Sequence, residues 1–373
     1  MNVENINKLN PVLRVLVVPL DWGLGHATRC IPIINELLKH NIEVIIAGEG
    51  AAIEILGKSH PEIVILRLKG YRVSYSRNKK FFFLKMLGQL PKIIAAVKNE
   101  KNWLSKTIRT HKIDAVISDN RFGLYHPAMR SVFITHQLSI QTGNDFFDKL
   151  AQKINYYFIN KYNECWVPDA AGKCNLAGIL SHPDTLPNTA VNYLGILSRF
   201  KKTVTEKKYE LLLMLSGPEP QRSIFETKLL SQLNNITGKI VLVRGLPASE
   251  NKLMTANDQL IIYNHLPADA LNELILQSKN IVARCGYSTV MDLFSLQQKA
   301  ILVPTPGQTE QEYLATHLME NKIFFTCAQD TFLLPEALAS AKDFDFSFSA
   351  AIPGIQETVI AHWVSDLQKR AKV

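Results

Sequence analysis

Short apolar runs alternate with longer segments of helical periodicity along the first half of the chain. The apolar runs are RVLVVPL (14–20), IEVIIAG (42–48), EIVILRL (62–68), IDAVISD (113–119), SVFITH (131–136) and ECWVPD (164–169). Runs that are apolar along their whole length are typical of parallel strands covered on both faces. The segments between them, such as HATRCIPIINELLKHN with apolar Ile33 and Leu37, predict the covering helices.

The same alternation starts again after the polar stretch SRFKKTVTEKK (198–208). The later runs are YELLLMLSG (209–217), GKIVLVRG (238–245), QLIIYNHLP (259–267), NIVARCG (280–286) and KAILVPTPG (299–307), with a helix expected over 220–235. We therefore expect an α/β protein with two Rossmann-like doubly wound domains that face each other across a cleft. The expected bounds are 1–197 for the first domain, 198–354 for the second domain and 355–373 for a helix packing back toward the first domain.

Length and composition narrow the class of protein. The chain has 373 residues, 47% of them hydrophobic, and no run approaches the ~20 apolar residues of a membrane-spanning helix. Its first residues, MNVENINKLNP, do not resemble a secretory signal, so we expect a cytoplasmic protein. The five cysteines (30, 165, 174, 285, 327) contain no CxxC pair. We expect neither a metal site nor a cofactor.

The net charge of +9 is concentrated in one segment. Residues 67–112 contain 13 Lys or Arg against the single acid Glu100, which is a charge of +12. Within it, 74–104 combines lysines with aromatics, a pattern that favours an anionic membrane surface on the inner face of the cell membrane. A core-facing stripe with a solvated lysine face is the alternative, and nucleic acid is the least favoured partner. Pro91 is expected to break or kink the helix there.

The stretch DWGLGHATR (21–29) follows the first strand and opens a helix. Gly23 and Gly25 allow a tight turn and a close approach to a ligand. His26 falls near the helix N-terminus, where the positive end of the dipole lowers an imidazole pKa. A neutral histidine at a strand end is a candidate general base. A structural turn with a surface histidine is the alternative.

Two more strand ends of the first half carry polar side chains. Asp119 lies in SDNRFGLYH (118–126), and His136 precedes Gln137 in FITHQLSIQTG (133–143). Either residue is a candidate base or acceptor contact, and a paired, buried polar group is the alternative for each.

Loops of the second half favour an anionic, hydroxyl-rich ligand. Ser216 and Gly217 follow a strand and precede a helix whose N–H groups would suit a diphosphate. In RCGYSTVMD (284–292), Arg284 and Gly286 end a strand and are expected to face the anionic ligand, and Ser288 or Thr289 would cap the next helix and aim its N–H groups at that ligand. Asp292 would hold ribose hydroxyls or, alternatively, complete a capping box with Thr289.

The stretch VPTPGQTEQEYLATHL (303–318) places long polar side chains after another strand. Gln308, Glu310, Gln311 and Glu312 would pair with the hydroxyls of a sugar. A solvated first helical turn is the alternative.

The order of these motifs resembles that of inverting glycosyltransferases with the GT-B fold, most closely the MurG type. That type transfers N-acetylglucosamine from UDP to a lipid-linked acceptor. The resemblance is strongest at RCGYSTVMD and GQTEQEYLA (307–315). It implies that 1–197 is an acceptor-binding domain and 198–354 a nucleotide-sugar-binding domain. It places Gly23, Gly25 and His26 near the diphosphate and the acceptor, and Ser216 and Gly217 at the diphosphate. It further implies a ribose contact at Asp292 and sugar contacts at Gln311 and Glu312. It also implies an apolar, basic-rimmed membrane patch in the first domain.

Departures from that pattern bear on the substrate. Asp21 and Trp22 stand where the family has glycines, the second loop SGPEP lacks the glycine-rich run, and Glu312 replaces a glutamine. We therefore expect another lipid-linked or lipopolysaccharide-type acceptor, with UDP-N-acetylglucosamine as donor. The expected reaction is a metal-independent displacement with His26 as base.

Two other functions use the same residues. GLGHATRC (23–30) resembles the GxGHxxRC motif of nucleotide-sugar hydrolases, in which histidine activates water. A non-catalytic nucleotide-sugar sensor would bind the donor without turnover.

Overall fold

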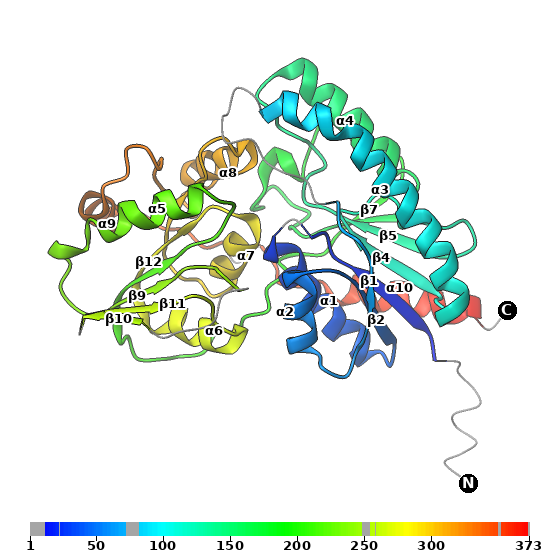
Figure 1. Cartoon of the computed structure of the whole chain (residues 1–373), viewed down its shortest axis with the longest axis horizontal. Coiled ribbons are helices and arrows are strands. Elements are labelled where there is room, and N and C mark those ends of the chain that lie inside the picture. Colours follow the sequence, from blue (N-terminus) through cyan, green and yellow to red (C-terminus); the bar gives the residue numbers. More distant parts are fainter. Residues whose placement is uncertain are drawn as a thin grey trace, which may run out of the picture.

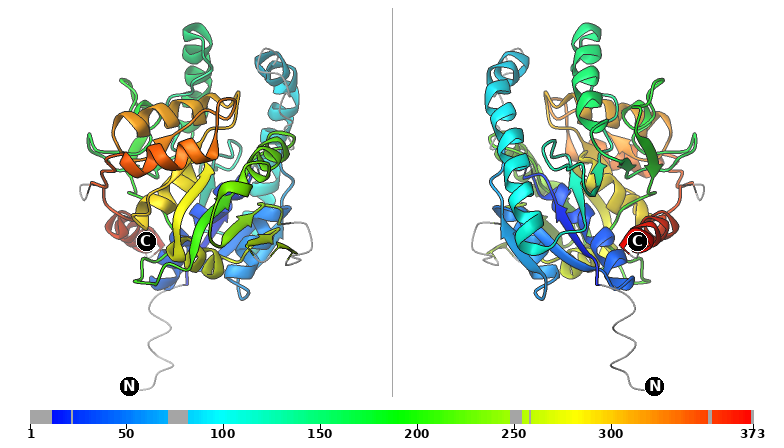
Figure 2. Two further views of the ribbon diagram at one scale, coloured as in Figure 1. Left: turned by 90° about the vertical axis from the view of Figure 1, so that its left-hand side faces the viewer. Right: turned by 90° about the vertical axis from the view of Figure 1, so that its right-hand side faces the viewer.

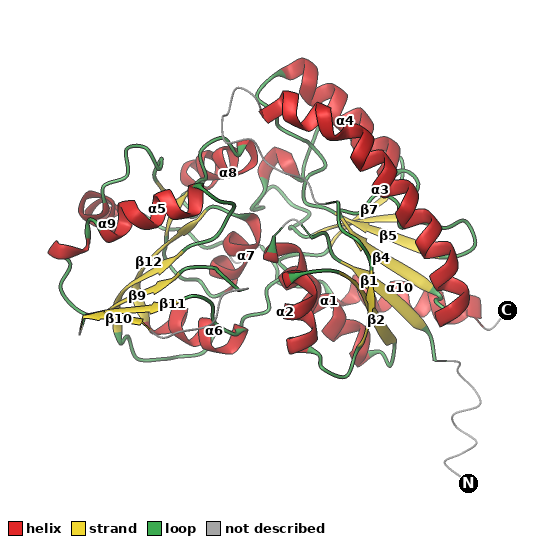
Figure 3. Ribbon diagram, viewed as in Figure 1, coloured by secondary structure: helices red, strands yellow, loops and turns green. Residues whose placement is uncertain are grey.

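The protein consists of two parallel-stranded units, each with helices on both faces of its sheet (Figures 1 and 3). The computed structural model describes residues 12–21, 23–71, 82–247, 254–257, 259–349 and 352–371. The expected α/β architecture with two doubly wound sheets is confirmed.

Within the described residues, the first sheet has seven parallel strands in the order β3-β2-β1-β4-β5-β6-β7. They are β1 (Arg14–Val18), β2 (Glu43–Gly48), β3 (Val64–Arg67), β4 (Ala115–Asp119), β5 (Arg130–Ile134), β6 (Glu164–Val167) and β7 (Ala190–Tyr193). The helices between them are α1 (Leu24–Lys39), α2 (Ala51–Ser59), α3 (Phe82–His111) and α4 (Asp145–Ile159), followed by a 3-10 turn at Gly178–Leu180.

The second sheet has the order β10-β11-β9-β8-β12-β13-β14, and among its described strands only β10 is antiparallel to its neighbour. The strands are β8 (Tyr209–Met214), β9 (Ile240–Val243), β10 (Met254–Asn257), β11 (Leu260–Tyr263), β12 (Ser278–Arg284), β13 (Ile301–Val303) and β14 (Phe325–Thr326). The helices are α5 (Gln221–Leu230), α6 (Ala268–Gln277), α7 (Tyr287–Ser295), α8 (Thr309–Glu320), α9 (Leu334–Asp343) and α10 (Glu357–Ala371).

Alternate residues of the central strands enter different cores, which is why the runs are apolar throughout. Val15 and Val17 of β1 belong to the core that includes α1, whereas Leu16 and Val18 pack in the core that includes Leu104 of α3. A strand covered on both faces has no position left for a polar side chain until it ends. The candidate polar residues therefore lie at the strand ends and in the loops that follow them.

The chain crosses between the sheets twice. Residues 201–208 have no regular structure and lead from the first sheet to β8. After α9 the chain returns, and α10 packs beside α1 of the first domain (Figure 1). The rings of Trp166 in β6 and Trp363 in α10 meet edge to face with centroids 5.4 Å apart, and Lys39 Nζ lies 2.9 Å from Glu357 Oε1.

Several local expectations are wrong. The helix α3 continues through Pro91 without a break; Pro91 is exposed, where water can solvate a carbonyl that lacks its usual N–H partner. The helix expected over 220–235 ends at Leu230, with a separate 3-10 turn at Leu233–Asn235. The short strands β7, β10 and β14 were not expected, because runs of two to four residues carry no clear apolar pattern.

Candidate functional site

The first loop and Asp119 meet where the strand order of the first sheet reverses. Strand β1 lies between β2 and β4, so the connections from β1 and β4 leave the sheet in opposite directions. Ligands of doubly wound proteins bind at such a switch point. The loop after β1 supplies His26 in the first turn of α1, and β4 ends with Asp119. Gly23 precedes α1 with φ 103°, a backbone conformation that favours glycine.

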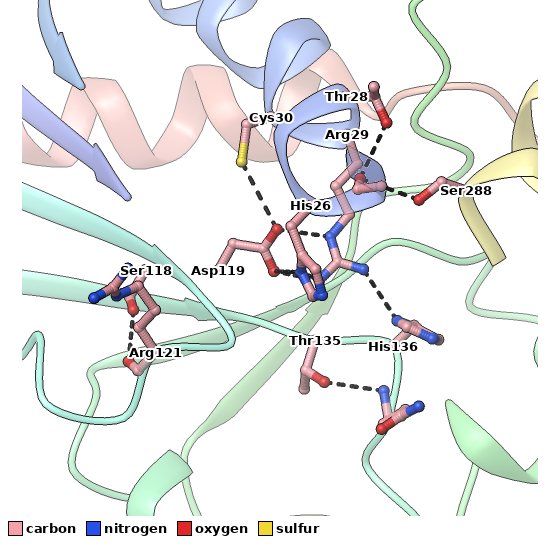
Figure 4. Close-up of polar contacts among 12 residues, drawn as sticks. His26, Thr28, Arg29, Cys30, Ser118, Asp119, Arg121, Thr135, His136 and Ser288 are labelled. Atoms are coloured by element: carbon pink, nitrogen blue, oxygen red, sulfur yellow. Dashed lines mark hydrogen bonds and ion pairs between the residues drawn. The ribbon is translucent and has the colours of Figure 1, made fainter. Parts of the chain in front are cut away.

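Asp119 is the fully buried centre of a charged cluster (Figure 4). Arg29, one turn after His26 on α1, donates from Nε to Asp119 Oδ2 at 2.8 Å and from Nη2 to Oδ1. His26 Nδ1 lies 3.2 Å from Asp119 Oδ1 and 2.7 Å from Arg29 Nη2. The side chain of His26 keeps 16% of its surface exposed, whereas that of Arg29 keeps 2%. His26 is therefore the member of this cluster that a ligand can reach.

Burial and pairing set the charges of this cluster. Burial alone would raise the pKa of Asp119, but the Arg29 guanidinium and His26 lower it from 3.8 to about 2. Burial, and then the positive charge of Arg29, lower the pKa of His26, and Asp119 offsets only part of this effect. At neutral pH Asp119 is a carboxylate and His26 a neutral imidazole, which is the state that a general base requires.

His136 connects this cluster to the second domain. Arg29 Nη1 lies 3.2 Å from His136 Nδ1, and His136 Nε2 lies 2.7 Å from Glu310 Oε1 at the start of α8. The His136 ring stacks on Tyr287 of α7 with centroids 4.3 Å apart and an interplanar angle of 8°. Burial would raise the pKa of Glu310, but the facing His136 and Arg29 lower it below its usual value. The three candidate catalytic residues His26, Asp119 and His136 thus come together.

The starts of α1 and α7 are in direct contact across the domains. Ser288 Oγ donates to the carbonyl oxygen of Gly25 at 3.1 Å. A Cβ on Gly25 would lie 2.6 Å from Ser288 Oγ, so a larger residue there would displace this hydroxyl. Neither Ser288 nor Thr289 caps α7, which contradicts that expectation: Gly286 is the N-cap residue and makes no side-chain cap bond. The N–H groups of both helix starts remain without a side-chain cap.

The corresponding switch point of the second sheet lies between β8 and β12. Ser216 and Gly217, with φ 97° at Gly217, are exposed after β8 and lead into α5. Arg284 ends β12 but is only 1% exposed, with its guanidinium over the Phe225 ring at 4.3 Å. Arg284 Nη2 donates to the carbonyl oxygen of Gln221 at 2.9 Å, and Nη1 donates to that of Pro304 at 3.3 Å. Arg284 therefore holds loops together and is not directly open to a ligand.

The Gln/Glu group after β13 binds its own loop. Gln311 Oε1 accepts from the N–H of Thr305 at 2.9 Å, and Glu312 Oε1 accepts from the N–H of Gly307 at the same distance. Gln308 Oε1 accepts from Gln311 Nε2 at 2.5 Å. These bonds shape the turn at the start of α8. The expected contacts with sugar hydroxyls would have to replace them.

Asp292 contacts the segment that joins the domains. Its Oδ1 accepts from Ser198 Oγ at 2.6 Å, and no cap bond forms at the start of α7, so the capping box with Thr289 is absent. Burial raises the pKa of Asp292 to about 6, and the neighbouring Arg199 offsets only part of this rise. The Nε of Arg199 is buried and has no hydrogen-bond partner among the described residues.

A pocket of about 290 Å³ opens beside the first loop. Its lining consists of Asp21, Gly23, Leu24 and residues 49–52 at the start of α2. Asp21 Oδ1 accepts from the N–H of Tyr71 at 3.2 Å, and Glu49 Oε1 accepts from the N–H of Gly70 at 2.9 Å. The pocket belongs to the first domain and lies next to the helix start that carries His26.

The basic segment 74–104 is described only in part. Residues 74–81, which include Lys79 and Lys80, lie outside the described residues. A second exposed apolar surface, the α4 stripe, consists of Phe146, Leu150, Ile154 and Tyr157, which are 71%, 43%, 44% and 60% exposed. In Figure 2, α3 (cyan) and α4 (green) stand apart at the same end of the first domain. None of the described helices is both long and apolar enough to span a bilayer.

Three contributors were missed in the sequence: Arg29, Tyr287 and Ser198. Arg29 carried a signal, since a residue three positions after His26 on a helix lies on the same face. Tyr287 and Ser198 carried none, because their partners Pro168 and Asp292 are 119 and 94 positions away. Glu310 was expected to contact a sugar and instead bonds to His136.

Comparisons with known proteins agree with this fold. Residues 222–345 match the glycosyltransferase family 28 C-terminal domain. No curated protein sequence matches the chain. Among solved structures, the glycosyltransferase SnogD from Streptomyces nogalater is similar at 14% identity and a TM-score of 0.59, over 96% of this chain and 100% of that one.

Two further structures have the same fold. MurG from Acinetobacter baumannii is similar at 13% identity and a TM-score of 0.53, over 96% of this chain and 100% of that one. A putative UDP-N-acetylglucosamine 2-epimerase from Listeria monocytogenes is similar at 11% identity and a TM-score of 0.63, over 96% and 97% of the two chains. Identities this low show a shared fold. The chain thus has the GT-B fold, with a second domain that is similar to the glycosyltransferase family 28 C-terminal domain, and together these findings support a glycosyltransferase.

Proposed function

We propose that the protein is an inverting, metal-independent glycosyltransferase that moves N-acetylglucosamine from UDP to a lipid-linked or lipopolysaccharide-type acceptor. The observation that carries the proposal is the His26–Asp119 pair at the switch point of the first sheet, with Nδ1 and Oδ1 3.2 Å apart. A partly exposed neutral imidazole beside a buried carboxylate is the arrangement of a general base with a partner for its positive charge.

The proposed reaction is one displacement at the anomeric carbon. The acceptor hydroxyl oxygen attacks from the face opposite the diphosphate, and its proton passes to His26. The bond from the anomeric carbon to the diphosphate oxygen breaks, and the nucleoside diphosphate leaves with the bonding electron pair. Asp119 stabilises the imidazolium that forms.

The N–H groups at the starts of α1, α5 and α7 would stabilise the leaving diphosphate, since helix starts favour negative charge. Ser216, Gly217, Gly286, Ser288 and Thr289 belong to these starts. Asp292 would hold the ribose hydroxyls in exchange for its bond to Ser198. Gln308, Gln311 and Glu312 would exchange bonds within their own turn for bonds to the sugar. Arg284 supports the loops that form the site.

The acceptor would approach from the first domain. The pocket beside Asp21 and Glu49 has room for a small polar part of it. The α4 stripe, flanked by the exposed lysines Lys149, Lys153 and Lys161, combines apolar and basic groups as surfaces that bind anionic membranes do. Together with 74–104, it would hold the protein at the membrane where a lipid-linked acceptor resides.

Nucleotide release from UDP-, GDP- and dTDP-sugars tests the proposal, with EDTA present and with or without a bacterial lipid extract. We expect release from the UDP-sugar only with the extract. His26→Ala should reduce turnover about 10²–10⁴-fold and retain UDP affinity, since one general base contributes about this much. His40→Ala, at the other end of α1, is the matched control and should behave as the wild type.

Other outcomes separate the rival functions. Equal release without lipid would establish a nucleotide-sugar hydrolase, in which His26 activates water. Binding of UDP-sugar without release would establish a sensor. Undiminished turnover by His26→Ala would exclude His26 as the base.

A further inference from the structure

Arg29 contacts every candidate proton-transfer group of the site. Its guanidinium donates to both oxygens of Asp119 and lies at hydrogen-bond distance from Nδ1 of His26 and Nδ1 of His136. It is 3% exposed. A guanidinium has five N–H donors and no acceptor, and it stays protonated in proteins. Any ring nitrogen that it bonds must therefore accept.

This requirement fixes the position of the proton on a neutral histidine. Nδ1 of His136 accepts from Arg29, so its proton is on Nε2, which agrees with the 2.7 Å contact from Nε2 to the Glu310 carboxylate. The same reasoning places the proton of His26 on Nε2, because Nδ1 lies 2.7 Å from Arg29 Nη2. In the alternative, Nδ1–H of His26 donates to Asp119 over the longer contact of 3.2 Å. This N–H group would then lie against the N–H donor of Arg29 Nη2.

We propose that Arg29 is a positioning residue that controls the tautomer of His26: in the resting protein it holds Nδ1 as an acceptor, so that His26 presents an Nε2–H donor to the site. His26 becomes a base only when Nη2 of Arg29 releases Nδ1: solvent water then takes the Nε2 proton and returns one to Nδ1, and the Nδ1–H donates a hydrogen bond to Asp119. The tautomer follows from the contacts, and its catalytic consequence rests on the proposed function of His26.

The resting state would limit wasteful hydrolysis of a bound donor. An Nε2–H group donates to an oxygen but takes no proton from water, so the base is inactive until the arginine moves. The arginine is connected through His136 to Glu310 of the second domain. Movement of the second domain is thus able to reach the tautomer of His26 through a continuous chain of bonds.

The charged and titratable groups around His26 come from five elements. They are Arg29 and Cys30 on α1, Asp119 on β4, His136 after β5, Tyr287 on α7 and Glu310 on α8. Asp119 and Glu310 favour the protonated imidazole, and Arg29 opposes it. Removal of Arg29 therefore both frees Nδ1 to donate to Asp119 and raises the pKa of His26.

Selective ¹⁵N-histidine labelling of the intact protein tests the tautomer directly. Two-bond ¹H–¹⁵N spectra at pH 8 should show protonated Nε2 and unprotonated Nδ1 for both His26 and His136, assigned with His26→Gln and His136→Gln. In Arg29→Met, His26 should change to the Nδ1–H form and titrate at higher pH. Arg121→Met, which removes another fully buried arginine from its pair with Glu100, is the control and should leave His26 unchanged.

Kinetics supply the second readout. The acid limb of the kcat/KM profile should move to higher pH in Arg29→Met, whereas a purely structural loss would lower activity at all pH values without moving the limb. An Nδ1–H tautomer in the wild type would overturn the proposal even if Arg29→Met fails to fold. Loss of turnover in His26→Ala together with that tautomer would retain the proposed function and reject the control by Arg29. The expected tautomers together with full activity in His26→Ala would retain the control of the tautomer by Arg29 and reject the proposed function of His26.

Discussion

At the scale of single residues, the site depends on charges that water does not reach. Asp119 is completely buried and Arg29 nearly so, and replacement of one partner of such a pair leaves an uncompensated charge. Their pairing nevertheless leaves His26 partly exposed and neutral. The cost of burying the carboxylate is thus offset by the arginine, and the histidine remains available to a ligand.

The pairing of Asp119 predicts a pH dependence of stability. Its pKa falls from 3.8 to about 2 on folding, so the folded state favours the ionised form. This contribution, about 2 kcal/mol, is present above pH 4 and is lost as the pH falls toward 2. Urea unfolding of wild type and Asp119→Asn measures it: the difference in free energy of unfolding should be constant from pH 7 to pH 5 and shrink below pH 4. A difference that does not change with pH would contradict the assignment.

At the scale of elements, α4 has an apolar face on the outside. Asn144 starts the helix by accepting from the N–H groups of Phe146 and Phe147. The α4 stripe follows at helical spacing, and its exposure would be unfavourable unless another surface covers it. The lysines beside it are the reason for proposing an anionic surface as its partner.

Vesicle binding tests the α4 stripe. Phe146→Ser/Ile154→Ser should weaken co-sedimentation with phosphatidylglycerol-containing vesicles by about 10-fold or more, because burying each apolar side chain contributes about 1.5–3 kcal/mol. Ile224→Ser/Leu333→Ser removes two comparably exposed apolar side chains of the second domain and should bind like the wild type. Equal binding by both double variants would exclude α4 as the contact.

At the scale of the whole molecule, the domains meet through polar bonds at the site itself. Besides His136–Glu310 and Ser288–Gly25, Tyr287 Oη donates to the carbonyl oxygen of Pro168 at 2.7 Å. The starts of α1 and α7 touch through Ser288 and Gly25, so a diphosphate that binds between them would have to displace this contact.

Glu310→Ala should shift the molecule toward an open arrangement. It removes a charge-assisted hydrogen bond between the domains, and such bonds contribute about 1.5–3 kcal/mol. Small-angle X-ray scattering should give a larger radius of gyration, and proteolysis within 201–208 should be faster. Glu320→Ala, at the exposed C-terminal end of the same helix, is the control. Identical scattering from both variants would show that the His136–Glu310 bond does not hold the domains together.

The sequence by itself determined the architecture. Apolar runs between helical segments predict doubly wound sheets, because only strands covered on both faces exclude polar residues along their length. It also determined that His26, Asp119 and His136 lie at strand ends, since parallel strands end at one edge of a sheet. The resemblance at RCGYSTVMD and GQTEQEYLA lies within residues 222–345, where the family domain matches.

Only the tertiary structure decided which partners these residues have. Arg29 and Asp119 are 90 positions apart, and His136 and Glu310 are 174 apart. No local pattern relates residues so distant, because their contact depends on how two sheets and two domains pack. For the same reason the local sequence predicted a capping box at Thr289 and an Arg284 that faces the ligand. Asp292 instead bonds to Ser198 and Arg284 is buried over Phe225, because the packing of the whole chain outweighs local propensity.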